Sequence, residues 1–150
     1  VLFSFDVSGA YASTKMPSFA LESVVDGKIV QSTTFKNKVL LVSFFATWCP
    51  PCKEEAPILV RLQNELSARG FSVIALSVDQ GSVSTVARFV QKNEINYPVL
   101  LAESKTAMDF GGVYGIPVAF LINKSGNVVR KYTGYVGYKA LNKDIQSLLN

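Results

Sequence analysis

The stretch Val39–Cys52 reads VLLVSFFATWCPPC, and it joins an apolar run to the only two cysteines of the chain. Within Val39–Phe45 the one polar residue is Ser43, so this run predicts a central strand that is buried on both faces. Pro51 then suits the first turn of a helix, because the N–H that proline lacks would have no partner there. The two cysteines are therefore expected at a strand-to-helix junction.

The position of Cys49 at or near the N-cap of that helix predicts its chemistry. Unpaired backbone N–H groups and the positive end of the helix dipole favour a thiolate there, and thiolate is the species that attacks disulfides. We expect Cys49 to be the exposed nucleophile and Cys52, one turn further on, to be the more buried resolving thiol. Cys49 would attack a substrate disulfide and Cys52 would displace the mixed disulfide, which predicts a thiol–disulfide oxidoreductase. The dipeptide Pro50-Pro51 offers no donor side chain, which favours reduction of substrates over their oxidation.

Two other uses of the cysteine pair remain open at this point. A purely structural disulfide would close a loop so small that it stabilises the fold only modestly. A zinc site would need two more thiolates, which a second copy of the chain would have to supply.

The rest of the chain alternates strand-like and helix-like segments. Phe71–Asp79 predicts a second buried strand, parallel to the first because the predicted helix 51–69 crosses between them. Asp26-Gly27 within Val24–Val30 is typical of a type I′ hairpin turn. The other expected elements are helices over 82–93, 104–110 and 138–149, an extended segment over 97–101, and paired strands over 118–122 and 128–132. Together they predict an α/β fold with a mixed sheet and helices on both faces.

Composition limits the classes of function. The chain has 150 residues, of which 49% are hydrophobic and 17% charged, so one domain with a substantial core is expected rather than disorder. The net charge is +4, but the lysines are scattered, so we expect no nucleic-acid partner. The absence of histidine excludes Ser-His and Cys-His catalytic pairs and histidine-based metal sites within the chain.

Residues 1–15 are interpreted as a leader or tail without a fixed fold, and residues 16–150 as the folded domain. Ala10-Tyr11-Ala12 fits the small-x-small pattern of signal-peptide cleavage, although Asp6 interrupts the apolar stretch before it. A remnant of a signal peptide and a simple tail therefore both stay open.

The segment Ala46–Pro57, ATWCPPCKEEAP, resembles the thioredoxin superfamily, and within it the TlpA/ResA-like thiol–disulfide oxidoreductases of cytochrome c maturation. The resemblance extends from about Met16 to the C-terminal helix. It implies a thioredoxin-like α/β/α sandwich with a mixed central sheet, an N-terminal β-hairpin and a helix-containing insertion after Ser77-Val78-Asp79. Gly115–Val118 is similar to the cis-proline segment of the superfamily.

The resemblance also implies roles for single residues. Pro117 would be cis and packed against the cysteines, and the Ile116 backbone would bind substrate peptide together with Trp48, Pro50 and Pro51; a trans Pro117 and a core Trp48 are the alternatives. Glu55 would be a partly buried acid that exchanges a proton with Cys52, the alternative being a solvated glutamate favoured by the helix dipole. Plain thioredoxins carry a buried aspartate where this chain has Ser43. Ser43 cannot act as that base, so Glu55 is the candidate for the role.

Partners and location follow from the same resemblance. We expect a monomer that acts on protein disulfides, apocytochrome c among them, and that is reduced by a membrane-bound or thioredoxin-type electron donor. The expected location is periplasmic or otherwise extracytoplasmic, with a membrane tether outside this chain, and no cofactor or metal beyond the Cys49–Cys52 disulfide. One alternative is a peroxiredoxin-like peroxidase. Its signature Pro-x-x-x-Thr-x-x-Cys places a threonine three residues before the cysteine, whereas Thr47 lies two residues before Cys49. The other alternative is a non-catalytic peptide-binding module.

Overall fold

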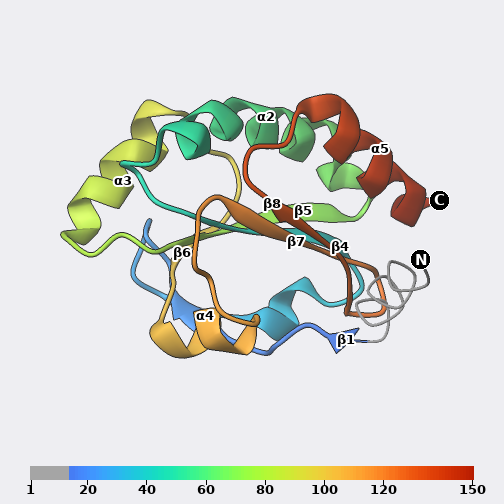
Figure 1. The fold of residues 1–150 in the computed structure, drawn as a ribbon, viewed down its shortest axis with the longest axis horizontal. Coiled ribbons are helices and arrows are strands. Elements are labelled where there is room, and N and C mark those ends of the chain that lie inside the picture. The colour runs from blue at the N-terminus through green and yellow to red at the C-terminus, as the bar shows by residue number, and fades with distance from the viewer. Residues whose placement is uncertain (1–13) are drawn as a thin grey trace.

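The computed structural model describes residues 14–150, and a six-stranded mixed sheet forms its middle layer (Figure 1). In spatial order the strands are β1 (Thr14–Lys15), β8 (Asn127–Thr133), β7 (Val118–Ile122), β4 (Val39–Phe45), β5 (Phe71–Ser77) and β6 (Val99–Leu101). β4 pairs in parallel with β5 and antiparallel with β7, so the predicted mixed sheet is confirmed.

Helices cover both faces of this sheet (Figure 1). One face carries α2 (Pro50–Leu66), α3 (Val83–Lys92) and α5 (Tyr138–Leu149). The other face carries α4 (Ser104–Asp109), the 3-10 turn η1 (Ser32–Phe35) and a separate hairpin of β2 (Ala20–Glu22) and β3 (Ile29–Gln31). The three layers confirm the predicted thioredoxin-like sandwich.

Two hydrophobic cores follow from the alternation of side chains along β4, all of whose residues are buried. Leu41 and Phe45 belong to the core beneath α2 and α5, whereas Leu40 and Phe44 belong to the core beneath α4 and η1. A strand with an apolar side chain on each face is stable only between two such layers, which is why β4 is central.

The end of α2 differs slightly from the expected helix over 51–69. The α-helix ends at Leu66, and the tighter 3-10 turn η2 (Ser67–Arg69) continues it. Gly70 then has a φ of 93°, in the left-handed region that favours glycine just past a helix end.

The expected tight turn at Asp26-Gly27 is wrong, although the N-terminal hairpin itself is confirmed. β2 begins earlier than predicted, and residues 23–28 form a wider loop in which only Gly27 has a positive φ. A type I′ turn requires positive φ at both central residues. The Val24 N–H instead donates to the Val99 carbonyl at 2.9 Å and the Val24 side chain is buried, so packing against the main sheet opens the turn.

The first described residues form β1, which the sequence did not predict. Thr14 pairs with Val128 and Lys15 with Asn127, so two residues of the expected leader belong to the sheet. Ala10–Ala12 and the rest of that segment lie outside the described residues. Among residues 14–150, every helix is too short or too polar to cross a bilayer.

Candidate active site

A disulfide joins Cys49 and Cys52 at the start of α2, with their Cα atoms 5.2 Å apart. Cys49 is the N-cap residue: its backbone is extended, and its Sγ accepts the Cys52 N–H at 3.3 Å. This donor is one of the N–H groups that a helix start leaves unpaired, so the fold places a hydrogen-bond donor where it can stabilise a thiolate.

The expectation that Cys49 is exposed is wrong for this oxidised state. Cys49 is 3% exposed and Cys52 is 5% exposed, so neither sulfur-bearing residue is open to water. The reason is the segment before β7, since the Ile116 carbonyl oxygen lies 3.8 Å from Cys49 Sγ and Pro117 is buried behind it. The Ile116–Pro117 peptide bond is cis, as the resemblance implied.

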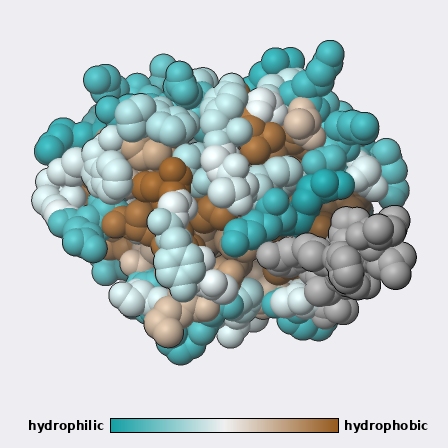
Figure 2. Space-filling view, viewed as in Figure 1, coloured by the Kyte–Doolittle hydropathy of each residue, from teal (hydrophilic) through white to brown (hydrophobic). Residues whose placement is uncertain are grey.

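Trp48 is 64% exposed, so the alternative of an ordinary core tryptophan is wrong. It lines a groove of about 580 Å³ together with Val78, Ile116 and the exposed Tyr114. Figure 2 shows hydrophobic surface gathered between the layer of α2 and α3 and the layer of α4. Of the remaining residues predicted to bind substrate, Pro50 is exposed and Pro51 is half-buried, so both border the surface around the disulfide.

Asp79 fixes the turn that precedes Cys49, a role that the sequence did not indicate. Its carboxylate accepts the Thr47 N–H at 3.1 Å, the Thr47 hydroxyl at 2.5 Å and the Ser77 hydroxyl at 2.7 Å. The parallel strands β4 and β5 end at the same sheet edge, which brings these residues together. The only available signal was an acidic residue at the end of a predicted strand.

Glu55 is 5% exposed, so the alternative of a solvated glutamate is wrong. Its Oε2 accepts the Val136 N–H at 2.8 Å. Burial raises the pKa of Glu55 to about 7, and the hydrogen bond from Val136 opposes that rise. A carboxyl group with such a pKa can both take up and release a proton near neutral pH, which is what the predicted exchange with Cys52 requires.

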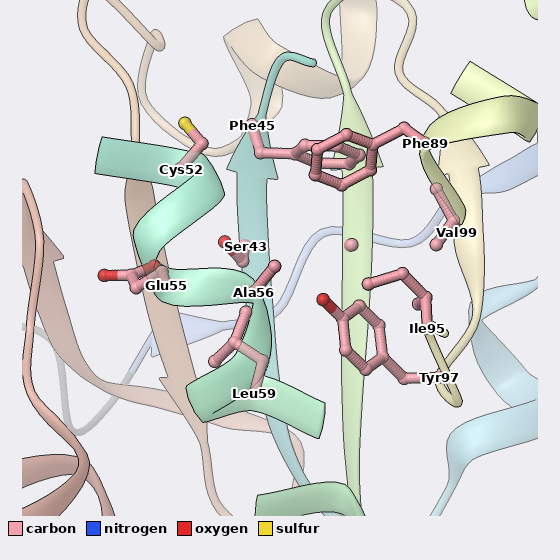
Figure 3. Close-up of a pocket in the computed structure, with 11 residues that line it drawn as sticks. Ser43, Phe45, Cys52, Glu55, Ala56, Leu59, Phe89, Ile95, Tyr97 and Val99 are labelled. Carbon is pink, nitrogen blue, oxygen red and sulfur yellow. The ribbon is translucent and has the colours of Figure 1, made fainter. Parts of the chain in front are cut away.

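A small cavity lies behind Cys52, between α2 and the sheet (Figure 3). Its polar lining consists of Cys52, Glu55, Ser43 from β4 and Tyr97 from the segment before β6, and the other lining residues are apolar. Tyr97 is 8% exposed and did not figure in the sequence prediction. Within residues 14–150, no three His, Cys, Asp or Glu side chains cluster as metal ligands would.

The Redoxin family model matches residues 11–147. This chain belongs to the Redoxin family. It is 32% identical over 118 residues to the thiol-disulfide oxidoreductase ResA of Bacillus subtilis, a match that covers 79% of this chain and 65% of that protein. This Redoxin-family chain therefore spans a little under two thirds of the length of that relative.

Solved structures agree with this assignment. A thiol:disulfide interchange protein of the thioredoxin family from Chlorobium tepidum is 34% identical with a TM-score of 0.85, over 91% of this chain and 97% of that one. A secreted thiol-disulfide isomerase from Corynebacterium glutamicum is 25% identical with a TM-score of 0.83, over 89% and 84%. The predicted membership of the thioredoxin superfamily, the ResA-like branch and the class of thiol–disulfide oxidoreductase are confirmed.

Proposed function

We propose that this Redoxin-family domain reduces disulfide bonds of proteins outside the cytoplasm. One observation carries the proposal: the Cys49–Cys52 disulfide starts α2 with Cys49 as its N-cap, directly beneath the Ile116–Pro117 segment. The sulfur is thus held where a thiolate is stabilised and where a polypeptide in the neighbouring groove would pass.

The proposed cycle starts from the reduced pair. The Cys49 thiolate attacks one sulfur of a substrate disulfide, a new S–S bond forms, and the other substrate sulfur leaves as a thiolate that takes up a proton. Cys52 then loses its proton and attacks Cys49, which releases the second substrate thiol and leaves the Cys49–Cys52 disulfide. A dithiol donor, either membrane-bound or of the thioredoxin type, returns two electrons and two protons to the pair.

Trp48, Pro50, Pro51, Ile116 and Pro117 are the proposed substrate-binding residues. Trp48, Pro50 and Pro51 adjoin the cysteines in the sequence, and the Ile116 carbonyl oxygen lies 3.8 Å from Cys49 Sγ. The Ile116 backbone offers hydrogen-bonding groups to an extended peptide. The exposed Trp48 side chain adds apolar contact area beside the reacting sulfur.

Apocytochrome c is the proposed substrate class, and a location outside the cytoplasm with a membrane tether beyond this chain is the proposed setting. The similarity to a structure named as a secreted thiol-disulfide isomerase supports the location, and the sequence resemblance to the cytochrome c maturation branch supports the substrate class. We further propose that the domain acts as a monomer. We also propose that it binds no nucleic acid, because its positive charges are scattered along the sequence.

The deciding measurement is the reduction potential of the Cys49–Cys52 pair in a thiol buffer, read by Trp48 fluorescence. A value near or below about −250 mV, as in thioredoxin, supports a reductase, whereas a value near about −120 mV, as in DsbA, reverses the direction of electron flow.

Two cysteine variants test the order of the steps. Cys52→Ser should accumulate a mixed disulfide with substrate through Cys49, and Cys49→Ser should abolish reduction of insulin disulfides. Activity that persists in Cys49→Ser would overturn the assigned nucleophile. Consumption of peroxide at the rate of disulfide reduction would instead favour the peroxidase.

A further inference from the structure

We propose that a groove beside the Cys49–Cys52 pair binds an acidic segment of the protein substrate. The inference deepens the proposed function, on which it rests, by naming the charge of the polypeptide that the domain reduces. The groove, which we call the α3 groove, has a volume of about 630 Å³ and is lined by residues from the start of α2 and from α3. These two helices cover the same face of the sheet (Figure 1).

The α3 groove adjoins the redox site. Thr47, which lines the groove, lies two residues before Cys49, and Lys53 directly follows Cys52. Asp79 holds this part of the groove in place, because its carboxylate accepts the Thr47 N–H at 3.1 Å. A polypeptide that presents a disulfide to Cys49 therefore has the α3 groove beside it.

Every charged side chain that lines the α3 groove is positive, and the three cations are Lys53, Arg88 and Lys92. They are far apart in the sequence, and the fold brings them together. All three are exposed, and within residues 14–150 none of their side chains forms a salt bridge or a hydrogen bond. The acidic residues next along each helix, Glu54 on α2 and Glu94 after α3, do not line the groove. Three cations without a counter-charge around one recess attract an anionic group.

One side of α3 concentrates this positive charge. Arg88, Phe89 and Lys92 follow Thr85 at spacings of three, four and seven residues, so they share one side of the helix and line the groove. The Cβ atoms of a helical pair four residues apart are about 5–6 Å from each other, and like charges at this spacing destabilise a helix. The helix dipole compensates this repulsion for Lys92, which lies in the last turn. A carboxylate of the substrate between Arg88 and Lys92 would neutralise the pair.

Phe89 gives the groove an anchored apolar wall. Its ring is half-buried, and its centroid lies 5.7 Å from that of the buried Phe45 ring (Figure 3). The groove thus combines a fixed apolar surface with cations at its rim. A recess of this kind fits a polypeptide with acidic side chains better than it fits the flat surface of a membrane.

The groove that Trp48 and Ile116 line carries the opposite charge. Its charged lining residues are Asp79 and Glu103, and the two grooves share no lining residue. An acidic segment is therefore attracted to the α3 groove and repelled from the other one. Opposite charges on two grooves that both border the redox site fix the orientation in which a substrate docks.

The kinetic test compares two peptides of equal length, each with one cysteine in a mixed disulfide with thionitrobenzoate. Glutamate occupies the positions around the cysteine in one peptide, and glutamine occupies them in the other. Attack of reduced Cys49 on the peptide sulfur releases the coloured thionitrobenzoate thiolate, and each rate is divided by the rate with dithiothreitol to remove differences in intrinsic reactivity. We expect the glutamate peptide to react about tenfold faster at low ionic strength. The advantage should vanish in about 1 M salt, where the Debye length is about 3 Å.

Two double variants locate the effect. Arg88→Gln/Lys92→Gln should lower the ratio of the two rates from about tenfold to about twofold, because only Lys53 remains. The matched control is Lys139→Gln/Lys143→Gln, which removes two exposed lysines at the same spacing from α5 and lowers the net charge of +4 by the same amount. The control should keep the tenfold ratio.

Two results of this kinetic test would overturn the inference. An equal fall of the ratio in both double variants would show that net charge, and not the α3 groove, attracts the peptide. Equal rates for the two peptides with wild-type protein would remove the preference altogether, while the proposed reductase activity would stand.

Binding without chemistry separates the groove from the proposed function. A glutamate peptide with serine in place of cysteine is added to isotope-labelled oxidised protein, and the backbone amide NMR signals of Thr85, Arg88 and Phe89 should shift more than with the glutamine peptide. If they do so but wild-type protein reduces neither peptide disulfide, the groove stands and the proposed function fails. Signals that respond to phosphatidylglycerol vesicles but not to the glutamate peptide would assign the groove to a membrane surface and overturn the inference.

Discussion

Glu55 is a carboxyl group that the fold holds almost entirely away from water, with the Val136 N–H as its one backbone partner. Burial without a counter-charge favours the neutral form, which is why the pKa of Glu55 rises rather than falls. A group in this position is useful to proton transfer and unfavourable to folding at the same time. The raised pKa of Glu55 therefore predicts an effect on the stability of the protein that does not depend on catalysis.

Glu55→Gln should stabilise the oxidised protein at neutral pH. The pKa of Glu55 is about 7 in the folded state against 4.5 for the ordinary group, so the folded state binds the proton more tightly. Stability from this group is fully present below pH 4.5, falls as the pH rises toward 7, and stays low above that. Glutamine removes this loss, and the expected gain is about 2–3 kcal/mol at pH 8.

Urea unfolding of both proteins at pH 4 and pH 8 checks this expectation. The difference between them should be small at pH 4 and largest at pH 8. Glu54→Gln, at the exposed neighbouring position, serves as the control and should show no such trend. A gain of the same size at both pH values would contradict the assigned cause.

At the scale of elements, one buried face of α2 carries both residues of the site and leucines of the hydrophobic core. Cys52, Glu55, Leu59, Leu62 and Leu66 recur at helical spacing and are all buried against the sheet. The placement of the dithiol and of the acid thus follows from the same packing that stabilises the helix. Loosening the buried leucines should therefore lower the stability of the site along with that of the fold.

Leu62→Ala should destabilise the protein by about 2–5 kcal/mol, because Leu62 is 0% exposed and its removal leaves a cavity beneath α2. Chemical denaturation of the oxidised form measures the change. Glu54→Ala on the exposed side of the same helix should stay within about 0.5 kcal/mol of wild type. Equal losses in the two variants would contradict core packing as the cause.

The sequence predicted the long periodic elements and the short β6 and α4, but it missed β1 and η1. β4, β7 and α5 were predicted at or near their observed bounds, because their apolar patterns reflect the layers on which they pack. β1 and η1 were not predicted, since two to four residues carry no period and depend on distant partners.

The same reason explains which residues of the site the sequence predicted and which it missed. Cys49 and Cys52 followed from their place at the start of the predicted helix, whereas Glu55 and Pro117 followed from family resemblance. Asp79 and Tyr97 join the site only through the arrangement of β4, β5 and β6, which no local pattern records.

At the scale of the whole molecule, the segment after β8 connects the two halves of the site. The Gly134 N–H donates to the Pro117 carbonyl at 2.9 Å, and the Val136 N–H donates to Glu55. The proline loop and the acid are therefore held by one short stretch at the end of the sheet. We therefore expect that reduction of the Cys49–Cys52 disulfide changes the stability of the whole domain.

The oxidised protein should be more stable than the reduced protein. Reduction removes the Cys49–Cys52 disulfide and leaves two thiols in a site where both cysteines are nearly inaccessible. For a reductase the folded pair must have a lower potential than the unfolded pair, and each 30 mV of that difference corresponds to about 1.4 kcal/mol.

Urea midpoints with and without a reductant give this difference directly. The Cys49→Ser/Cys52→Ser double variant should not respond to the reductant. A reduced form more stable than the oxidised one, as in DsbA, would instead indicate an oxidant.

The N-cap position of Cys49 has a consequence for how other proteins distinguish the two forms of this domain. One atom serves both as the acceptor at the first turn of α2 and as the sulfur that gains and loses electrons. Reduction to the thiolate adds a negative charge at the positive end of a helix, and oxidation removes it. A protein that docks at this end can therefore distinguish the reduced form from the oxidised form by the charge on Cys49.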